Sequence, residues 1–102
     1  MEKRVPHYNL VNVQSFVADK TSRPFTRTAL QGGLSMGFTE LQMRGIVLSL
    51  TRTDFYKSMT THADHQQWQD VYHGKTSDDR IVYIKITGFL DGRPPVIQFK
   101  AK

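Results

Sequence analysis

Hydrophobic and polar positions change their spacing along the chain, and the change separates a helical first half from a strand-rich end. The apolar residues between Leu10 and Val17 recur at helical intervals, which predicts a helix over about residues 9–19. In the last third, residues 81–87 alternate apolar with polar side chains and are rich in β-branched residues, and residues 96–100 repeat the alternation. This order predicts an α+β fold, with helices packed on one face of an antiparallel sheet.

Two further helices are expected between these regions. Residues 26–31 have the pattern of a short helix, which Gly32-Gly33 should end. Thr39-Glu40 has the form of a helix start. The residues that this third helix would turn inward are Leu41, Ile46, Val47 and Leu50, whereas Gln42 and Arg44 would face outward. Residues 55–59 fit either one helical turn or an extended strand, because periodicity cannot decide over so few residues.

The two final strands should form a hairpin, because Asp91-Gly92 between them is a strong tight-turn signal. A turn centred there places Ile86 opposite Ile97, Ile84 opposite Phe99 and Tyr83 opposite Lys100. This register matches the apolar faces, and a slip of one residue would turn one strand over. Directly opposed side chains have Cβ atoms roughly 5 Å apart, so Tyr83 and Lys100 should be neighbours on the face away from the core.

Residues 68–73 predict a third strand, joined to Ile81 by the polar loop GKTSDDR. If His73 pairs with Ile81, then Gln69 and Val71 share the face of Tyr83 and Lys85. Trp68 fits either a place in the core, where buried aromatic side chains usually serve packing, or a role in stacking.

Composition narrows the function classes. The chain has 102 residues, which suits one domain over residues 1–102, and 14 Lys and Arg against 9 Asp and Glu give a net charge of +5. This basic excess fits a nucleic-acid partner, an acidic protein partner or solubility alone. There is no cysteine, which excludes disulfides and cysteine-ligated metals. The amino terminus lacks a signal-peptide pattern and no apolar run is long enough to span a membrane, so we expect a cytoplasmic protein.

Few classical catalytic motifs are present. His62, Asp64 and His65 have a spacing that could hold a metal, but a zinc site needs further ligands, so we interpret the segment as a polar loop and expect no metal and no cofactor. Neither a Walker phosphate loop nor a Gly-x-Ser-x-Gly elbow occurs. What remains is a basic, polar set of side chains: Lys57, Gln69, Tyr83, Lys85, Gln98 and Lys100. From alternation alone, an ordinary solvated sheet face is a better interpretation of this set than a functional site.

Four segments of the chain resemble the motility quorum-sensing regulator (MqsR) family: MEKRVPH, DFYKSMTTHADHQQWQDVY, VYIKIT and IQFKAK. Proteins of that family are mRNA interferases, the toxins of type II toxin–antitoxin systems, with a RelE-like α+β fold. The match covers both ends and nearly all of the second half, and is looser over residues 19–50. Where the family has SF before its last lysine, this chain has QF.

The resemblance implies a catalytic set of Lys57, Gln69, Tyr83 and Lys100, three of which share the face that alternation had separated. It also implies ribosome-independent cleavage of mRNA at short GC-beginning sequences, and an MqsA-like antitoxin that neutralises the toxin and represses the operon. We expect Lys85 and Gln98, on the same face, to contact single-stranded RNA.

The expected reaction is metal-independent and leaves 2′,3′-cyclic phosphate and 5′-hydroxyl ends. Free lysine and tyrosine titrate near 10, which is high for a base at neutral pH. We therefore assign Lys57 and Lys100 mainly to phosphate charge, Tyr83 to proton transfer and Gln69 to orientation, and an exchange of these roles stays open at this point. Two alternatives remain open at this point: a non-catalytic nucleic-acid-binding regulator that uses the same face, and an antitoxin-binding module without activity.

Overall fold

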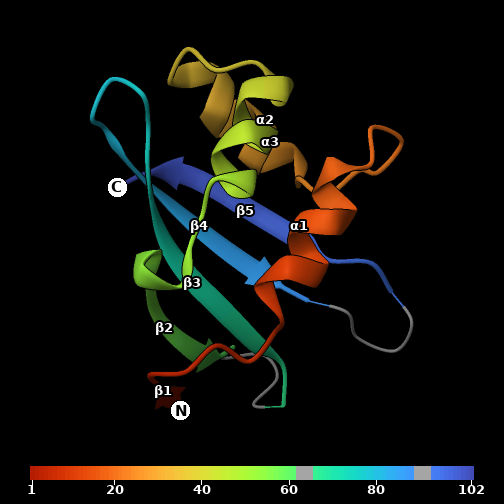
Figure 1. Cartoon of the computed structure of the whole chain (residues 1–102), viewed down its shortest axis with the longest axis vertical. Helices are drawn as coiled ribbons and strands as arrows, with labels where there is room; N and C mark the ends of the chain where they lie inside the picture. Colours follow the sequence, from red (N-terminus) through yellow and green to blue (C-terminus); the bar gives the residue numbers. More distant parts are fainter. Residues whose placement is uncertain (62–65, 89–92) are drawn as a thin grey trace.

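The fold combines helices with one antiparallel sheet (Figure 1). The computed structural model describes residues 1–61, 66–88 and 93–102. Within these ranges the helices are α1 (Leu10–Ala18), α2 (Arg27–Ser35) and α3 (Glu40–Leu48), followed by a short 3-10 helix at Arg52–Asp54. The strands lie in the sheet in chain order: β1 (Glu2–Lys3), β2 (Phe55–Thr60), β3 (Trp68–Lys75), β4 (Ile81–Thr87) and β5 (Val96–Ala101). The α+β prediction is confirmed, and the arrangement is consistent with a RelE-like fold.

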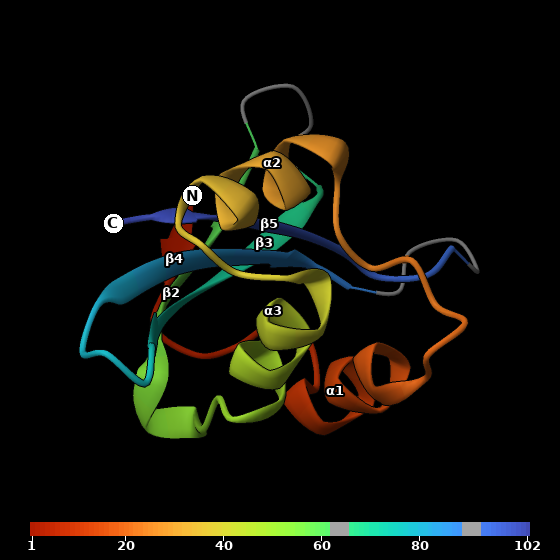
Figure 2. The same ribbon diagram turned by 90° about the horizontal axis from the view of Figure 1, so that it is seen from above.

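The helices take two positions around the sheet, so the prediction that they pack on one face holds for α1 and α3 but not for α2. In Figure 2, α1 and α3 lie on one side of the strands and α2 lies on the other, next to β5. The segment before α2 covers the outer edge of β5, since Ile97 N–H donates to the Pro24 carbonyl at 2.7 Å and Thr26 N–H donates to the Ile97 carbonyl at 3.2 Å. The face of the sheet opposite α1 and α3, which we call the open face, is therefore bordered by α2 along β5. No helix in the described ranges has the length and apolar character needed to cross a membrane.

Each helix begins at a side chain that caps it. Asn9, Thr26 and Thr39 accept hydrogen bonds from backbone N–H groups three residues later, at 3.0–3.1 Å. The prediction that Gly32-Gly33 ends the second helix is wrong, because α2 continues to Ser35. The pair serves close packing instead: a Cβ on Gly32 would lie 2.7 Å from the Phe99 carbonyl oxygen of β5, and a Cβ on Gly33 would overlap Met43 of α3.

Helix α3 faces the core differently from the prediction. Val47 and the following Leu50 are buried as expected and Ile46 packs against the core, but Leu41 is 73% exposed and its place is taken by Met43. Arg44, expected to face outward, is only 6% exposed. Its guanidinium donates to three carbonyls at the end of α1 and just beyond, those of Val17 (2.7 Å), Asp19 (3.1 Å) and Ser22 (2.6 Å). A helix end leaves carbonyls without partners, and arginine satisfies several at once.

The predicted hairpin register is confirmed, since Ile86 pairs with Ile97, Ile84 with Phe99 and Tyr83 with Lys100. The Asp91-Gly92 turn itself lies outside the described residues. The ambiguous FYKSM segment is strand, as part of β2. Strand β3 is also present, but His73 pairs with Tyr83 rather than Ile81. Because that shift is two residues, the predicted faces are unchanged.

The core lies between the sheet and the helices, where the inward residues of β4 and β5 meet Val13, Val17, Met43 and Val47. Trp68 is not part of this cluster, so its placement in the core is wrong. It is half-buried under the amino-terminal arm, residues 1–9, with the His7 ring stacked 5.4 Å away between centroids and Lys3 Nζ 4.2 Å from its centroid.

A buried carboxylate fastens this arm to the sheet. Asp70 of β3 is 1% exposed and accepts hydrogen bonds from the backbone N–H groups of His7 (3.0 Å) and Tyr8 (2.9 Å). It also accepts from the Ser58 hydroxyl of β2 at 2.6 Å. Hydrogen bonds to a charged acceptor are stronger than neutral ones, so the arm is held as a fixed part of the structure.

Candidate active site

Cross-strand rows bring the polar set together on the open face. One row runs across the sheet through Lys57, Val71, Lys85 and Gln98, each directly opposite the next. A neighbouring row joins His73, Tyr83 and Lys100 in the same way. Gln69 lies two residues before Val71 and therefore on the same face, opposite Met59.

A β-bulge in β2 determines how Lys57 reaches this face. Phe55 pairs with Tyr72 and Lys57 pairs with Val71, so Tyr56 is an extra residue between them. Phe55 packs inward against Tyr72, with ring centroids 5.4 Å apart, whereas the Tyr56 ring stacks on His73 at 4.6 Å. The bulge thus directs Tyr56 and Lys57 to the open face in succession, an effect typical of bulges beside active sites.

Lys57 forms an ion pair with the amino-terminal strand. Its Nζ lies 2.7 Å from Oε1 of Glu2, and its side chain is 19% exposed. The hydrogen bond to Glu2 raises the pKa of Lys57, and the same bond lowers the pKa of Glu2. Lys57 is therefore a firmly protonated cation at neutral pH and can stabilise negative charge, but it cannot act there as a base.

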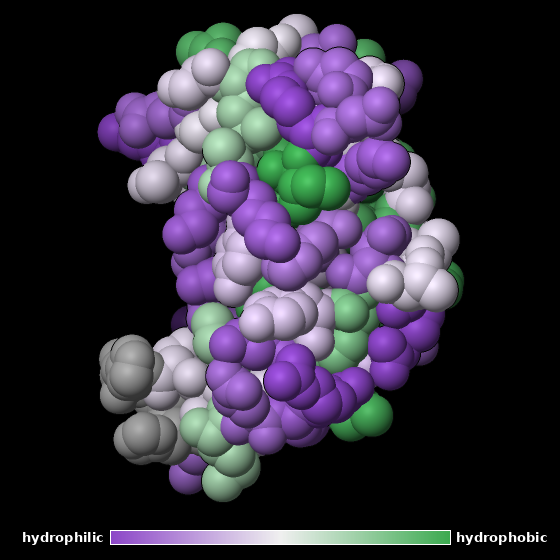
Figure 3. Space-filling view, turned by 90° about the vertical axis from the view of Figure 1, so that its left-hand side faces the viewer, coloured by the Kyte–Doolittle hydropathy of each residue, from purple (hydrophilic) through white to green (hydrophobic). Residues whose placement is uncertain are grey.

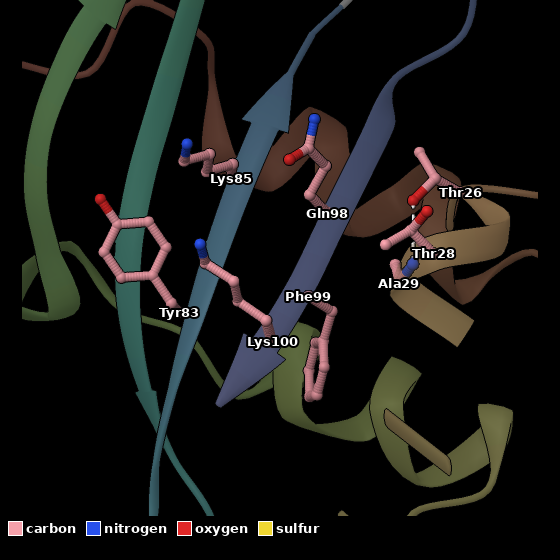
Figure 4. Close-up of a pocket in the computed structure, with 8 residues that line it drawn as sticks. All are labelled: Thr26, Thr28, Ala29, Tyr83, Lys85, Gln98, Phe99 and Lys100. Atoms are coloured by element: carbon pink, nitrogen blue, oxygen red, sulfur yellow. Dashed lines mark hydrogen bonds between the residues drawn. The ribbon is translucent and has the colours of Figure 1, made fainter. Parts of the chain in front are cut away.

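Two further cations flank Tyr83. The Nζ atoms of Lys100 and Lys85 lie 5.5 and 5.7 Å from the centre of its ring. Figure 4 shows all three side chains on the same side of β4 and β5. Partial burial lowers the pKa of Lys85, and the charges of Lys100 and Lys57 lower it further. Lys85 is thus close enough to Lys57 and to Lys100 for their charges to repel its own, which favours the binding of an anion beside it.

A hollow of about 250 Å³ opens beside this cluster, between β4, β5 and the start of α2. Its lining residues are Thr26, Thr28, Ala29, Tyr83, Lys85, Gln98, Phe99 and Lys100 (Figure 4). The side of the molecule that carries β2 and the β3–β4 turn is mainly hydrophilic, with small, separated apolar patches (Figure 3). A hollow lined in part by Lys85 and Lys100 suits a solvated polyanion better than an apolar ligand.

Comparisons with known proteins identify the family of this chain. A family described as "Motility quorum-sensing regulator, toxin of MqsA" matches residues 5–101. The chain belongs to the MqsR toxin family. It is also 40% identical over 102 residues to the mRNA interferase toxin MqsR of Escherichia coli (strain K12), an alignment that covers the whole of both chains.

The four residues singled out by resemblance to the MqsR family all lie on the open face, but at unequal distances from one another. Tyr83 and Lys100 are direct cross-strand partners, as predicted. Lys57 stands two strands from Tyr83, yet the pair is close enough for a charge on Tyr83 to affect the pKa of Lys57. Gln69 lies at the side of the cluster. Of the two residues expected to contact RNA, Lys85 lies between Lys57 and Lys100, and Gln98 lies at the edge strand.

Sequence reasoning did not single out three neighbours of this cluster. Tyr56 reaches the open face only because of the bulge, and the contact of His73 with Tyr83, at 5.5 Å between ring centroids, depends on the observed register. Among the described residues, Nε2 of His73 is buried without a hydrogen-bond partner, and burial lowers the pKa of this ring. Glu2 is 55 residues from Lys57, so no local pattern links them.

The side chains considered as metal ligands belong to a different part of the chain. His62, Asp64 and His65 lie outside the described residues. Within the described ranges, no group of three or more His, Cys, Asp or Glu side chains is placed to hold a metal ion.

Proposed function

We propose that this chain is the toxin of a type II toxin–antitoxin system and an mRNA interferase that cleaves single-stranded mRNA without a metal or the ribosome. The observation that carries the proposal is the cross-strand group of Lys57, Tyr83, Lys85 and Lys100 on the open face. Support comes from the E. coli relative, which is named an mRNA interferase toxin. The family description, "toxin of MqsA", supports an MqsA-like antitoxin as protein partner.

The proposed chemistry is an internal transesterification. The 2′-oxygen attacks the adjacent phosphorus, the bond from phosphorus to the 5′-oxygen breaks, and the products are a 2′,3′-cyclic phosphate and a 5′-hydroxyl. The ammonium groups of Lys57 and Lys100 stabilise the charge that grows on the phosphate. Tyr83 transfers a proton, delivering it to the leaving 5′-oxygen, and Gln69 orients the substrate. Each proton-transfer group of this kind typically contributes about 10²–10⁴-fold in rate.

The remaining polar residues fit a role in RNA binding. Lys85 and Gln98 continue the row from Lys57 towards the hollow beside α2. In the proposed complex they contact the RNA on either side of the cleaved bond. Cleavage at short GC-beginning sequences is the expected specificity for a member of this family.

The test is cleavage of an end-labelled single-stranded RNA by purified protein in EDTA. We expect products with 2′,3′-cyclic phosphate ends, which resist phosphatase until acid opens the ring, and we expect Lys100→Gln to abolish them. RNA retention without cleavage would instead identify a nucleic-acid-binding regulator. If the protein neither retained nor cleaved the RNA, the result would identify a module that only binds the antitoxin. Full dependence on an added divalent ion would refute the metal-independent mechanism.

A further inference from the structure

The reaction proposed above needs a group that accepts the 2′-hydroxyl proton, and the four family residues supply none that is suited to it at neutral pH. Lys57 stays protonated because Glu2 raises its pKa. Free tyrosine and lysine are likewise protonated at pH 7. A residue outside that set is therefore the better source of a base.

Glu2 brings a carboxylate to the open face. It pairs with Met59 of β2, which shares that face with Lys57 and Gln69, and its Oε1 accepts a hydrogen bond from Lys57 at 2.7 Å. Lys57 has three N–H donors, so it can hold this carboxylate with one and a phosphate oxygen with another. The two residues together place an anion and a cation at one end of the basic cluster.

The position of Glu2 is fixed by backbone contacts on both sides. The Met1 carbonyl accepts from Thr60 N–H at 3.0 Å, and Lys3 pairs with Ser58 in the ladder. Further along the arm, Asp70 holds the N–H groups of His7 and Tyr8. Most surface ion pairs join two flexible side chains and contribute little. Here both backbones are held in a sheet, which is the kind of support that a catalytic group requires.

We propose that Glu2 is the general base of the RNA cleavage. Its carboxylate takes the proton from the 2′-hydroxyl as the 2′-oxygen bonds to phosphorus, while the leaving 5′-oxygen takes a proton from Tyr83. Solvent then removes the proton from Glu2 and restores the one on Tyr83, so no water, oxidant or metal is consumed. The inference rests on the proposed function, and Lys57 acquires a second role as the group that orients the base.

Electrostatics around Glu2 determines the charge of its carboxylate. The groups that face it are Lys57 from β2, and Arg4 and the terminal amine from its own arm, all of them cations that lower its pKa. Glu2 is therefore ionised at neutral pH, the form that a base requires.

Glu2→Gln tests the role, because glutamine keeps the shape and can still accept a hydrogen bond from Lys57 but cannot take a proton. In untagged protein, we expect the single-turnover cleavage rate at saturating RNA to fall at least a hundredfold, with RNA affinity unchanged or tighter. Glu40→Gln is the matched control, since it removes the same charge from α3, where Glu40 pairs with Arg44 at 3.5 Å. It should cleave at the wild-type rate.

A second measurement separates a base from a positioning residue. In Glu2→Ala, added formate should restore cleavage in proportion to its concentration, and chloride at the same ionic strength should not. A Glu2→Gln rate within threefold of wild type, or a rate increase, would overturn the proposal and leave Glu2 as a competitor of phosphate for Lys57. A rate loss that formate does not rescue would assign Glu2 to positioning Lys57, and would also overturn it. Failure of the wild-type protein to cleave would refute the proposed function instead.

Discussion

Two adjacent residues of β4, Tyr83 and Ile84, separate the chemistry of the open face from the stability of the core. Tyr83 points to the open face beside Lys100 and His73. Ile84 points the other way and is fully buried. Substituting each in turn should therefore damage one property and spare the other.

The expected magnitudes follow from these environments. Ile84→Ala removes three buried carbon atoms, worth about 0.8 kcal/mol each in lost transfer free energy. A cavity of roughly 75 Å³ would add up to about 2 kcal/mol if its walls did not relax. The unfolding free energy should thus fall by about 2.5–4 kcal/mol. Tyr83→Phe keeps the ring contacts and removes only a hydroxyl, so stability should change by less than about 0.5 kcal/mol, whereas turnover should fall at least about a hundredfold.

Urea unfolding and single-turnover RNA cleavage, measured on both variants, check this pair of expectations. The rate for Ile84→Ala should be divided by its folded fraction, after which it should be near the wild-type value. The reasoning would be refuted if Tyr83→Phe unfolded the protein, because the face assignment would then be wrong. Cleavage by Tyr83→Phe at the wild-type rate would contradict the proton-transfer role.

Three other predictions use different properties of the fold. Asp70→Ala removes a charged acceptor from three donors, so the unfolding free energy in urea should fall by about 2–4 kcal/mol; an unchanged value would mean that the arm is not fastened there. Burial, with Lys3 and Lys102 nearby, lowers the pKa values of His7 and His73 below the ordinary 6.5. The unfolded chain then binds more protons below pH 6.5, so stability should fall as the pH drops through that value, and His73→Gln should flatten the slope. For binding of a non-cleavable RNA, Lys100→Gln should reduce the slope of log affinity against log salt by about 0.7; an unchanged slope would remove Lys100 from the phosphate contacts.

The hairpin of β4 and β5 could be predicted in detail because two independent signals agreed. Alternation determined which side chains share a face, and a register centred on the Asp-Gly dipeptide gave the pairings that β4 and β5 have. The predicted register of β3 was wrong by two residues because the polar sequence GKTSDDR does not indicate where the strand ends. Gly74 continues β3. A Cβ at this position would lie only 3.1–3.3 Å from side-chain carbons of Ile84, Val82 and Ile46. The turn then closes between Thr76 and Arg80, with Thr76 N–H donating to the Arg80 carbonyl at 2.8 Å.

Other features depend on contacts between distant segments and leave no local pattern. Arg44 has the polarity of a surface residue, yet it is buried because the end of α1 offers it carbonyl partners. Gly32-Gly33 has the form of a helix stop, yet it allows α2 to approach β5 and α3. The candidate site likewise has one part that a local pattern predicts and one part that it does not. Alternation placed Tyr83 and Lys100 together, whereas the contact of Lys57 with Glu2 requires both the bulge and the pairing of β1 with β2.

The alternation of β4 and β5 has a consequence for how this protein can diverge. Residues that hold the core and residues that face the open side occupy successive positions in the same strands. A lineage can therefore exchange every second residue of a strand while the hydrophobic layer beneath stays untouched. In β2 the bulge gives two successive positions, Tyr56 and Lys57, to the open face. Core residues and open-face residues of β4 and β5 are thus interleaved in the sequence, and selection can act on one set without disturbing the other.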